Sequence, residues 1–182
     1  MNKIEARYLE KFNTPSDINE HLPALRTLAE ECNHITEMGV RFVVSTWAFL
    51  LAKPKKLISI DIQYYSEIEE AIKLAQEEKI DFSFIVGDTT KIEIEETDLL
   101  FIDTLHTYGQ LKQELNLHAQ KVRKYIAFHD TVTFGSADEQ GPRTFGPGLR
   151  PAIYEFLENN SQWYIFKDYT NNNGLLVLKK RE

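Results

Sequence analysis

The sequence predicts an α/β fold: a doubly wound, mostly parallel sheet with helices on both faces and a C-terminal antiparallel hairpin. Short apolar segments alternate along the chain with amphipathic ones, and this alternation is typical of parallel strands joined by helical crossovers. The stretch 162–180 instead indicates two strands around the turn 171–174, Asn-Asn-Asn-Gly. A length of 182 residues fits one domain over 1–182.

Five segments are expected to form the parallel strands. Each is short, rich in β-branched or aromatic residues and largely continuous in apolar character, as buried parallel strands are. They are 35–39, 57–62, 82–88, 98–103 and 125–130. Most of them end at or near an acidic residue, so we expect several carboxylates where the carboxyl ends of the strands meet.

The amphipathic segments are expected to form helices, because their apolar residues recur every three or four positions. They cover 25–32, 68–75, 111–122 and 151–160. Ser66 with Glu69 and Thr107 with Gln110 have the spacing of capping boxes at two helix starts. The N-terminal part, 1–33, is expected to be a helical segment that packs on the sheet or covers its ligand edge.

The loop 131–148 differs from the other connections. It is rich in glycine and proline and is longer than most loops in a compact domain. Because it directly follows the fifth predicted strand, we expect it to form a mobile lid over the ligand edge of the sheet.

Composition argues against several classes of protein. The chain has 21 basic and 28 acidic residues, a net charge of −7, which disfavours binding to nucleic acid. No apolar run is long enough to span a bilayer and no cleavable leader is recognisable, so we expect a cytoplasmic protein. The single cysteine, Cys32, rules out an internal disulfide or a cysteine metal cluster.

The stretch 35–50, ITEMGVRFVVSTWAFL, indicates a strand, a turn at Gly39 and then a helix. A dinucleotide site needs several glycines around its pyrophosphate, and this turn has one. A nucleoside ligand without phosphates needs a close backbone approach, here at Gly39, and a carboxylate that accepts from both ribose hydroxyls. Asp61 lies at the end of the next predicted strand. The spacing between Gly39 and Asp61 fits a binding site for S-adenosylmethionine.

Four short motifs follow one another on the predicted strands: Glu37-Met38-Gly39, Ile60-Asp61, Gly87-Asp88 and Leu100 to Asp103. In this order, and followed by the terminal hairpin, they resemble the motifs of class I S-adenosylmethionine-dependent methyltransferases over nearly the whole chain. The resemblance implies a Rossmann-like fold and a one-carbon transferase. It also implies cofactor contacts at Glu37, Gly39, Asp61, Asp88 and Asp103.

The chain departs from the pattern of that superfamily after Gly39, where residues 41–45 replace the usual further small residues. This departure affects the contacts to the methionine end of the cofactor. Arg41 or the Ser45 hydroxyl could hold the cofactor carboxylate there.

Each of the predicted cofactor carboxylates, taken alone, also has a structural explanation. Glu37 could satisfy nearby backbone amides, and Asp61 could cap the following turn. Asp88 could form an Asx-turn with Thr89 and Thr90, because carboxylates at strand ends often do so. The cofactor hypothesis therefore depends on all three occurring together and in order.

Three longer stretches resemble a narrower group of methyltransferases. They are GVRFVVSTWAFL (39–50), FIDTLHTYGQLKQEL (101–115) and FHDT (128–131). They are most similar to a bacterial and viral subgroup that is often associated with glycosyltransferases, and more distantly to macrolide-sugar and catechol O-methyltransferases. The resemblance implies O-methylation of a sugar or glycan hydroxyl, with a glycosyltransferase as a candidate partner.

Two pairs of ionisable residues are expected at neighbouring strand ends, Asp103 with His106 and His129 with Asp130. They could form a site for a hard cation or a histidine–carboxylate base. In the sugar and catechol O-methyltransferases that the chain resembles, a divalent ion such as Mg or Mn is held here, and Asp103 and Asp130 match its ligands. His129 stands where an acidic residue is common, and histidine is a poor magnesium ligand but a good base.

We therefore expect His129 or Asp130 to take the proton of the acceptor hydroxyl, and Asp103 to position the sulfonium or a metal. Candidates for substrate binding are His106, Tyr108 and Asn172. Two alternatives to a sugar O-methyltransferase stay open at this point. One is a small-phenol (catechol-like) O-methyltransferase, and the other is a non-catalytic S-adenosylmethionine-binding module that assists a glycosyltransferase.

Overall fold

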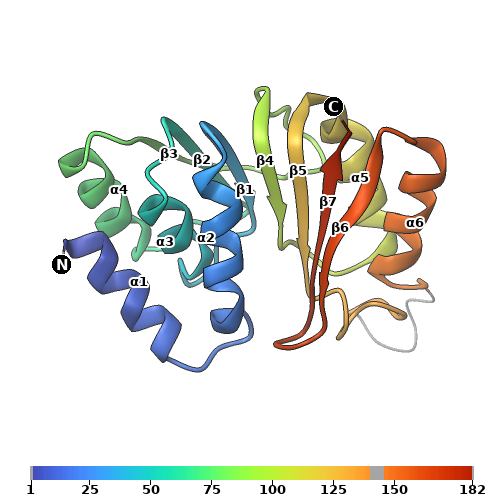
Figure 1. The fold of residues 1–182 in the computed structure, drawn as a ribbon, viewed down its shortest axis with the longest axis horizontal. Helices are drawn as coiled ribbons and strands as arrows, with labels where there is room; N and C mark the ends of the chain where they lie inside the picture. Colours follow the sequence, from blue (N-terminus) through green and yellow to red (C-terminus); the bar gives the residue numbers. More distant parts are fainter. Residues whose placement is uncertain (1, 140–145, 182) are drawn as a thin grey trace.

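The computed structural model describes residues 2–139 and 146–181, which contain a seven-stranded sheet with the order β3-β2-β1-β4-β5-β7-β6 (Figure 1). The strands are β1 (His34–Met38), β2 (Lys56–Asp61), β3 (Asp81–Val86), β4 (Thr97–Ile102), β5 (Val122–His129), β6 (Trp163–Tyr169) and β7 (Leu175–Lys180). Strands β1 to β5 pair in parallel, whereas β7 runs antiparallel between β5 and β6. The predicted α/β fold with its C-terminal hairpin is confirmed.

The strand order reverses between β1 and β4, because the chain winds outward from β1 through β2 to β3 and then returns to the other side of β1. In doubly wound sheets, ligands bind in the crevice at such a reversal, outside the carboxyl ends of the strands. Gly39 follows β1 and Asp103 follows β4. The Asp103 N–H donates to the Met38 carbonyl at 2.8 Å, so the two strand ends stay in contact where the crevice begins.

Within the described ranges, six α-helices cover the two faces of the sheet. They are α1 (Lys3–Asn13), α2 (Leu22–Glu30), α3 (Ser45–Leu51), α4 (Ile68–Glu77), α5 (Tyr108–His118) and α6 (Leu149–Asn159). Helices α1 to α4 pack on one face, and α5 and α6 pack on the other (Figure 1). A hydrophobic core lies on each face of the sheet, and strand β5 contributes side chains to both. Tyr125 and Ala127 face the core under α1 to α4, while Ile126 and Phe128 face the core under α5 and α6. Strands covered on both faces explain the continuous apolar runs in the sequence.

Two elements differ from their predictions. Strand β3 was expected to be buried, but it is an edge strand, and Val86 is 57% exposed. Val122 was expected to end a helical stripe, but α5 ends at His118 and Val122 begins β5 after a 3-10 turn, Ala119–Lys121. Val122 is part of a strand because β5 pairs with β4. The spacing of apolar residues along the sequence does not reveal such pairing.

One of the two predicted helix caps is present. Thr107 is the N-cap of α5, and its hydroxyl oxygen accepts from the Gln110 N–H at 3.3 Å. Ser66 does not cap α4, because the helix begins after Glu67 and the Ser66 hydroxyl donates to the Glu67 carboxylate at 3.2 Å. The predicted capping box at Ser66 is therefore wrong.

The turn between β6 and β7 joins distant parts of the chain. Asn172 Oδ1 accepts from the Glu20 N–H at 2.9 Å, and its Nδ2 donates to the Ser16 carbonyl at 2.8 Å. The Asn173 carbonyl accepts from the Val132 N–H at 2.8 Å. The N-terminal segment is thereby anchored beside the carboxyl end of β5.

The predicted lid, 131–148, is described in part, because 140–145 lie outside the described residues. Asp138 Oδ1 accepts from the Tyr108 N–H at 2.9 Å and from the Gly148 N–H at 3.0 Å. These bonds tie the described part of the segment to the start of α5. Its function as a lid stays a prediction.

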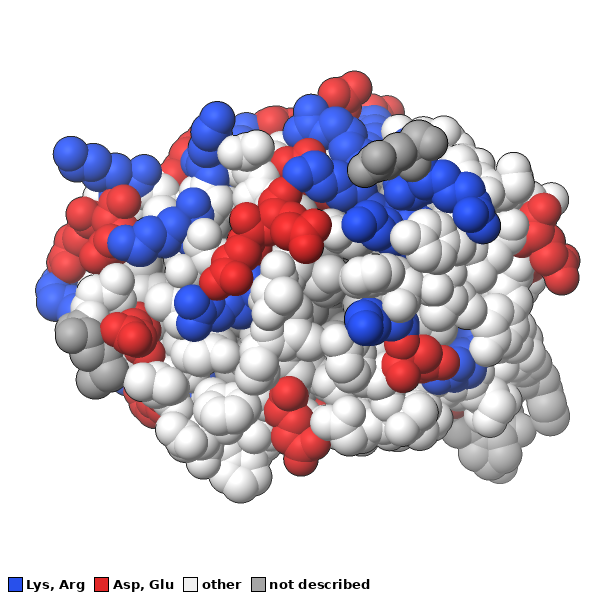
Figure 2. All heavy atoms as spheres, viewed as in Figure 1, with Lys and Arg blue, Asp and Glu red and all other residues white. Residues whose placement is uncertain are grey.

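The surface drawn in Figure 2 carries basic and acidic side chains close together in its upper half and is mostly uncharged in its lower half. Strand β5 runs toward this lower half (Figure 1). The mixture of charges on this face is unlike the continuous basic surface that follows a phosphate backbone. Among the described helices, none combines the length and apolar character needed to cross a membrane.

Candidate active site

A cavity of about 510 Å³ lies along the carboxyl ends of β1, β2 and β4. Its walls come from the turn after β1, the ends of β2 and β3, the segment after β4, and Asp17 and Ile18 of the N-terminal segment. This volume is typical of small-molecule sites. The residues that the sequence singled out and that line it include Gly39, Arg41, Ser45, Asp61, Asp88 and Asp103.

The turn after β1 shows why one glycine is enough. Gly39 has a φ of +85°, and a Cβ atom there would overlap the carbonyl oxygen of Asp103. Arg41 and Val43 also have positive φ angles, 42° and 55°, which is unusual for side chains of this size. The chain thus places its glycine where the ends of β1 and β4 touch and builds the remaining turn from strained residues.

Asp61 anchors this turn from the end of β2. Its Oδ2 accepts from the Val40 N–H at 2.8 Å and the Arg41 N–H at 3.1 Å, and its Oδ1 accepts from the Gln63 N–H at 3.1 Å. The structural role considered for Asp61 is therefore present. The carboxylate also lines the cavity, and because each carboxylate oxygen has two lone pairs, Oδ1 keeps capacity for a ligand hydroxyl.

Glu37 lies in β1 with no exposed surface, surrounded by hydroxyl groups. Its carboxyl oxygens accept from Ser45 at 2.5 Å, Thr46 at 2.8 Å and Ser59 at 2.5 Å. Burial raises the pKa of Glu37 to about 7, although the three hydroxyl groups act in the opposite direction. Glu37 is absent from the described cavity wall, so the geometry gives it the task of fixing the start of α3 in place of the predicted direct contact with a cofactor.

Arg41 and Ser45 both lie on the cavity wall, as the sequence suggested. The Ser45 hydroxyl already donates to Glu37. The Arg41 guanidinium makes an exposed ion pair with Asp17 at 3.3 Å, and such pairs contribute little energy. Arg41 is therefore the better placed of the two to bind an anionic group of a ligand.

Asp88 forms the Asx-turn that was considered for it. Its Oδ1 accepts from the Thr90 N–H at 3.0 Å and from the Thr90 hydroxyl at 2.6 Å. Hydrogen bonds from Lys91 and Thr90 lower the pKa of Asp88 to about 2. Because Asp88 also lines the cavity, the structural role does not remove it from the site.

Glu114, a residue that sequence reasoning missed, is buried in α5 and holds three residues of the cavity wall. It accepts from the Thr89 hydroxyl at 2.5 Å, the Thr104 hydroxyl at 2.9 Å and the Gln110 side chain at 3.1 Å. Burial raises the pKa of Glu114 against the effect of these bonds. Its place between two leucines on the apolar face of α5 was the signal in the sequence.

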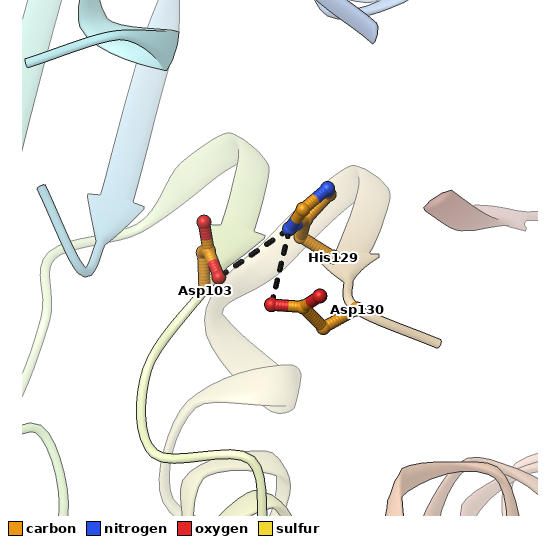
Figure 3. A group of neighbouring side chains, drawn as sticks. All are labelled: Asp103, His129 and Asp130. Atoms are coloured by element: carbon orange, nitrogen blue, oxygen red, sulfur yellow. Dashed lines mark ion pairs between the residues drawn. The ribbon is translucent and has the colours of Figure 1, made fainter. Parts of the chain in front are cut away.

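Two histidines and two aspartates meet at the ends of β4 and β5. His106 Nε2 lies 3.1 Å from Asp103 Oδ1 and 2.9 Å from Asp130 Oδ2. His129 Nδ1 approaches the same two oxygens at 3.6 and 3.4 Å, as the dashed lines in Figure 3 show. Asp130 has a φ of 58° directly after β5. Two carboxylates thus lie between two imidazoles.

These contacts shift the pKa of every member of the cluster. Burial acts to lower the pKa of His106 and of His129, but contacts with Asp103 and Asp130 outweigh it and raise both to about 10. Burial acts to raise the pKa of both aspartates, but the same contacts hold each below its ordinary value. Near neutral pH, the two imidazolium and two carboxylate groups carry no net charge.

His129 does not fit its expected role as the base. It is 1% exposed and is absent from the described wall of the cavity, and its Nε2 faces the Asn172 carbonyl at 3.3 Å. Its raised pKa also removes the near-neutral titration on which the expectation depended. Asp130 is also buried and absent from the described wall, whereas the Asp103 side chain is 24% exposed and lines the cavity. Asp103 is therefore the aspartate of this cluster that can meet an acceptor.

The positions of these two histidines and two aspartates show whether the expected divalent ion fits at this site. Ligand atoms of Asp103, His129 and Asp130 lie within 4.8 Å of one another. His129 Nδ1 and Asp130 Oδ1 are buried and have no hydrogen-bond partner among the described residues, as ion ligands would. His106 does not fit, because its Nε2 contacts the two carboxylate oxygens that would bind the ion. With His106 in this position, the site does not fit a divalent ion.

Two of the three predicted substrate residues lie elsewhere. The Tyr108 hydroxyl bonds to Glu155 of α6, and the Asn172 side chain holds the N-terminal segment. Both have structural roles in place of the predicted substrate contacts. His106 does line the cavity, together with Glu139, for which no pattern in the sequence indicated a role.

Comparison with protein-family models gives no match, and comparison with curated protein sequences gives none either. Solved structures do match. A proposed caffeoyl-CoA O-methyltransferase from Staphylococcus aureus has a TM-score of 0.67 and 13% identity, covering 99% of this chain and 93% of that one. The N-methyltransferase NodS from Bradyrhizobium japonicum WM9, in complex with S-adenosylhomocysteine, has a TM-score of 0.66 and 12% identity over 100% of both chains.

The O-methyltransferase TomG from Streptomyces achromogenes, in complex with S-adenosylmethionine, has a TM-score of 0.64 and 15% identity, covering 100% of this chain and 91% of that one. At such low identities, these likenesses establish the fold. The chain has the fold of class I S-adenosylmethionine-dependent methyltransferases, as the resemblance of its motifs implied.

Proposed function

We propose that the protein is an S-adenosylmethionine-dependent O-methyltransferase that acts on a hydroxyl group of a sugar or glycan. The observation that carries this proposal is a cavity whose wall brings together Asp61, the Gly39 turn and Asp103. We call the part of the wall around Asp61 and Asp88 the nucleoside end and the part around Asp103 and His106 the acceptor end. Structures with the same fold contain S-adenosylmethionine or S-adenosylhomocysteine, which supports the choice of cofactor.

The nucleoside end of the cavity fits the cofactor residue by residue. Asp61 accepts the ribose hydroxyls, and Asp88 lies where the third motif of the resemblance places the adenine. Gly39 lets the ligand approach the backbone closely, and Arg41 binds the carboxylate of the methionine end. When bound, S-adenosylmethionine supplies a methyl group on a positively charged sulfur. Asp103 faces that charge, because its backbone touches the Gly39 turn.

Methyl transfer needs an oxygen held in line with the methyl carbon and a group that takes its proton. Asp103 lines the cavity and accepts a hydrogen bond from the acceptor hydroxyl. With the cofactor bound, the acceptor oxygen would take the methyl group from the sulfonium, which would leave as the thioether of S-adenosylhomocysteine, and Asp103 would take the acceptor proton. An oxygen that gains a methyl group becomes strongly acidic, so a weakly basic carboxylate suffices.

A sugar acceptor agrees with the wall of the acceptor end. Asp103, Gln110 and Glu139 offer polar groups to several hydroxyls, and Leu105 offers exposed apolar surface to the C–H face of a sugar ring. We further propose that the reaction takes place in the cytoplasm. A glycosyltransferase is the proposed partner that supplies the glycan.

The test is formation of S-adenosylhomocysteine from S-adenosylmethionine, measured by mass spectrometry with a panel of nucleotide sugars, oligosaccharides, catechols and amines. The proposal expects product with a sugar and none above background without an acceptor. Product with catechols alone would replace the sugar by a small phenol. Tight cofactor binding without turnover on any acceptor would favour a binding module.

A further inference from the structure

We propose that the His106 side chain occupies the place of a divalent cation at the acceptor end of the cavity and thereby excludes such an ion from Asp103 and Asp130. Its meaning for methyl transfer rests on the proposed function. The position of His106 itself does not depend on which acceptor is methylated. His106 Nε2 contacts Asp103 Oδ1 at 3.1 Å and Asp130 Oδ2 at 2.9 Å, as a bound cation would.

Both ring nitrogens of His106 face carboxylates. Nε2 lies between the two aspartates, and Nδ1 lies 2.9 Å from Glu139 Oε2. A neutral imidazole has one N–H and one lone pair, and a carboxylate would repel that lone pair. Both nitrogens therefore donate, and the ring carries a positive charge. Three carboxylates surround one imidazolium, much as carboxylates surround a metal ion.

The ring is held in place by its neighbours. Phe134 stacks on it, with ring centroids 4.8 Å apart and planes 5° from parallel. The His106 N–H donates to Glu139 Oε2 at 3.2 Å, and the Glu139 N–H donates to the His106 carbonyl at 2.9 Å. The His106 side chain is 12% exposed. An ion that entered would have to displace the ring and break these contacts.

The position of His129 follows from that of His106. His129 Nδ1 points at the same two oxygens, but at 3.4 and 3.6 Å, because His106 already holds them at shorter distances. This sharing accounts for the buried Nδ1 without a hydrogen bond. Removal of the His106 ring would leave the carboxylates of Asp103 and Asp130 and one buried histidine around an open space, a donor set that suits Mn²⁺.

The experiment measures Mn²⁺ binding by electron paramagnetic resonance, with the full chain and without cofactor or acceptor. The parent should bind Mn²⁺ no better than Asp130→Asn does. His106→Ala should bind at least about tenfold more tightly than the parent, because Asp103 and Asp130 lose their cation. The double variant His106→Ala/Asp130→Asn should lose this gain.

His34→Ala is the matched control, since His34 is also buried but lies at the amino end of β1, whereas the cluster lies at the carboxyl ends of β4 and β5. It should bind Mn²⁺ as the parent does. Thermal unfolding shows whether each variant is folded, and His106→Ser, which also removes the ring, serves if His106→Ala does not fold.

Two results would overturn the inference. The first is a parent that binds Mn²⁺ as tightly as the His106 variant and loses it with Asp130→Asn. The second is a folded His106 variant that gains no affinity. Binding of S-adenosylhomocysteine to the same samples separates this test from the proposed function. Absence of that binding would remove the methyltransferase proposal and leave the Mn²⁺ result standing.

Discussion

The carboxylates near the two ends of the cavity have different hydrogen-bond partners. Close to the nucleoside end, Asp61 accepts from backbone amides, and Glu37, which is buried and absent from the cavity wall, accepts from hydroxyl groups. At the acceptor end, Asp103 and Asp130 contact two imidazoles. Neutral donors leave a carboxylate free to accept from a further neutral donor, such as a ribose hydroxyl. Imidazolium partners instead balance its charge inside the protein, where an unpaired charge is costly.

The largest effect is expected at the acceptor end, from Asp103→Asn. This change removes the carboxylate that meets the acceptor, so turnover should fall by roughly a hundred- to ten-thousand-fold, the range for a positioned base. The measurement is the initial rate of S-adenosylhomocysteine formation with the best acceptor of the panel. Asp81→Asn, at the start of β3, is the control. An unchanged rate for Asp103→Asn would show that the reaction takes place elsewhere.

The next effect concerns stability at the nucleoside end. Burial raises the pKa of Glu37 to about 7, so the folded protein binds the Glu37 proton more tightly than the unfolded chain does. Protonation of Glu37 therefore stabilises the folded state. This contribution is fully present below the unfolded pKa and is lost as pH rises through the folded one. The free energy of unfolding should therefore fall by roughly 3 kcal/mol between about pH 4.5 and 7 through Glu37.

Glu37→Gln tests this dependence, because the amide keeps the shape of the side chain and cannot ionise. Urea unfolding at a series of pH values should give a flatter profile for the variant than for the parent over this interval. Glu158→Gln, on the exposed side of α6, should keep the parental profile. Parallel profiles for Glu37→Gln and the parent would mean that Glu37 ionises normally in its hydroxyl cage.

Asp61→Ala should weaken cofactor binding by about 1.5–3 kcal/mol, the range for hydrogen bonds to a charged group. Calorimetry with S-adenosylhomocysteine measures it, with Glu158→Ala as the control. The loss has two sources, the ribose contact and the anchoring of the Gly39 turn. Asp61→Asn keeps one oxygen for the backbone amides and should lose less. Equal affinity of Asp61→Ala and the parent would contradict the ribose assignment.

The smallest effect is expected from Asn172→Ala, outside the cavity. The variant loses the bonds to Glu20 and Ser16, so the free energy of unfolding should fall by about 1–2 kcal/mol. The KM for the acceptor should stay as in the parent. A large rise in this KM, with unfolding unchanged, would restore Asn172 to the substrate site.

The sequence predicted the sheet, the ligand edge and most of the nucleoside end, because these depend on local patterns. Buried parallel strands have continuous apolar runs, and Gly39, Asp61 and Asp88 each follow such a run. The exceptions arise from tertiary contacts. Val122 belongs to β5 because β4 pairs with it, and β3 is half exposed because no strand covers its outer edge.

The acceptor end was harder to predict, because its chemistry depends on how side chains face one another. Sequence order placed Asp103, His106, His129 and Asp130 near two strand ends and left a cation site and a base equally open. The proposal that His106 takes the place of a cation rests on the direction of its ring. Neither that direction nor the approach of Glu139 to the ring leaves a periodic signal in the chain.

The most direct test of the account concerns the single-glycine turn, which is proposed to admit a nucleoside ligand and not a pyrophosphate. Isothermal titration of the parent protein with S-adenosylhomocysteine, NAD⁺ and ATP under identical conditions measures this choice. We expect saturable binding of S-adenosylhomocysteine and no detectable heat from the two phosphate-bearing ligands, because one glycine cannot wrap a pyrophosphate in backbone amides. Binding of NAD⁺ or ATP as tight as that of S-adenosylhomocysteine would contradict it.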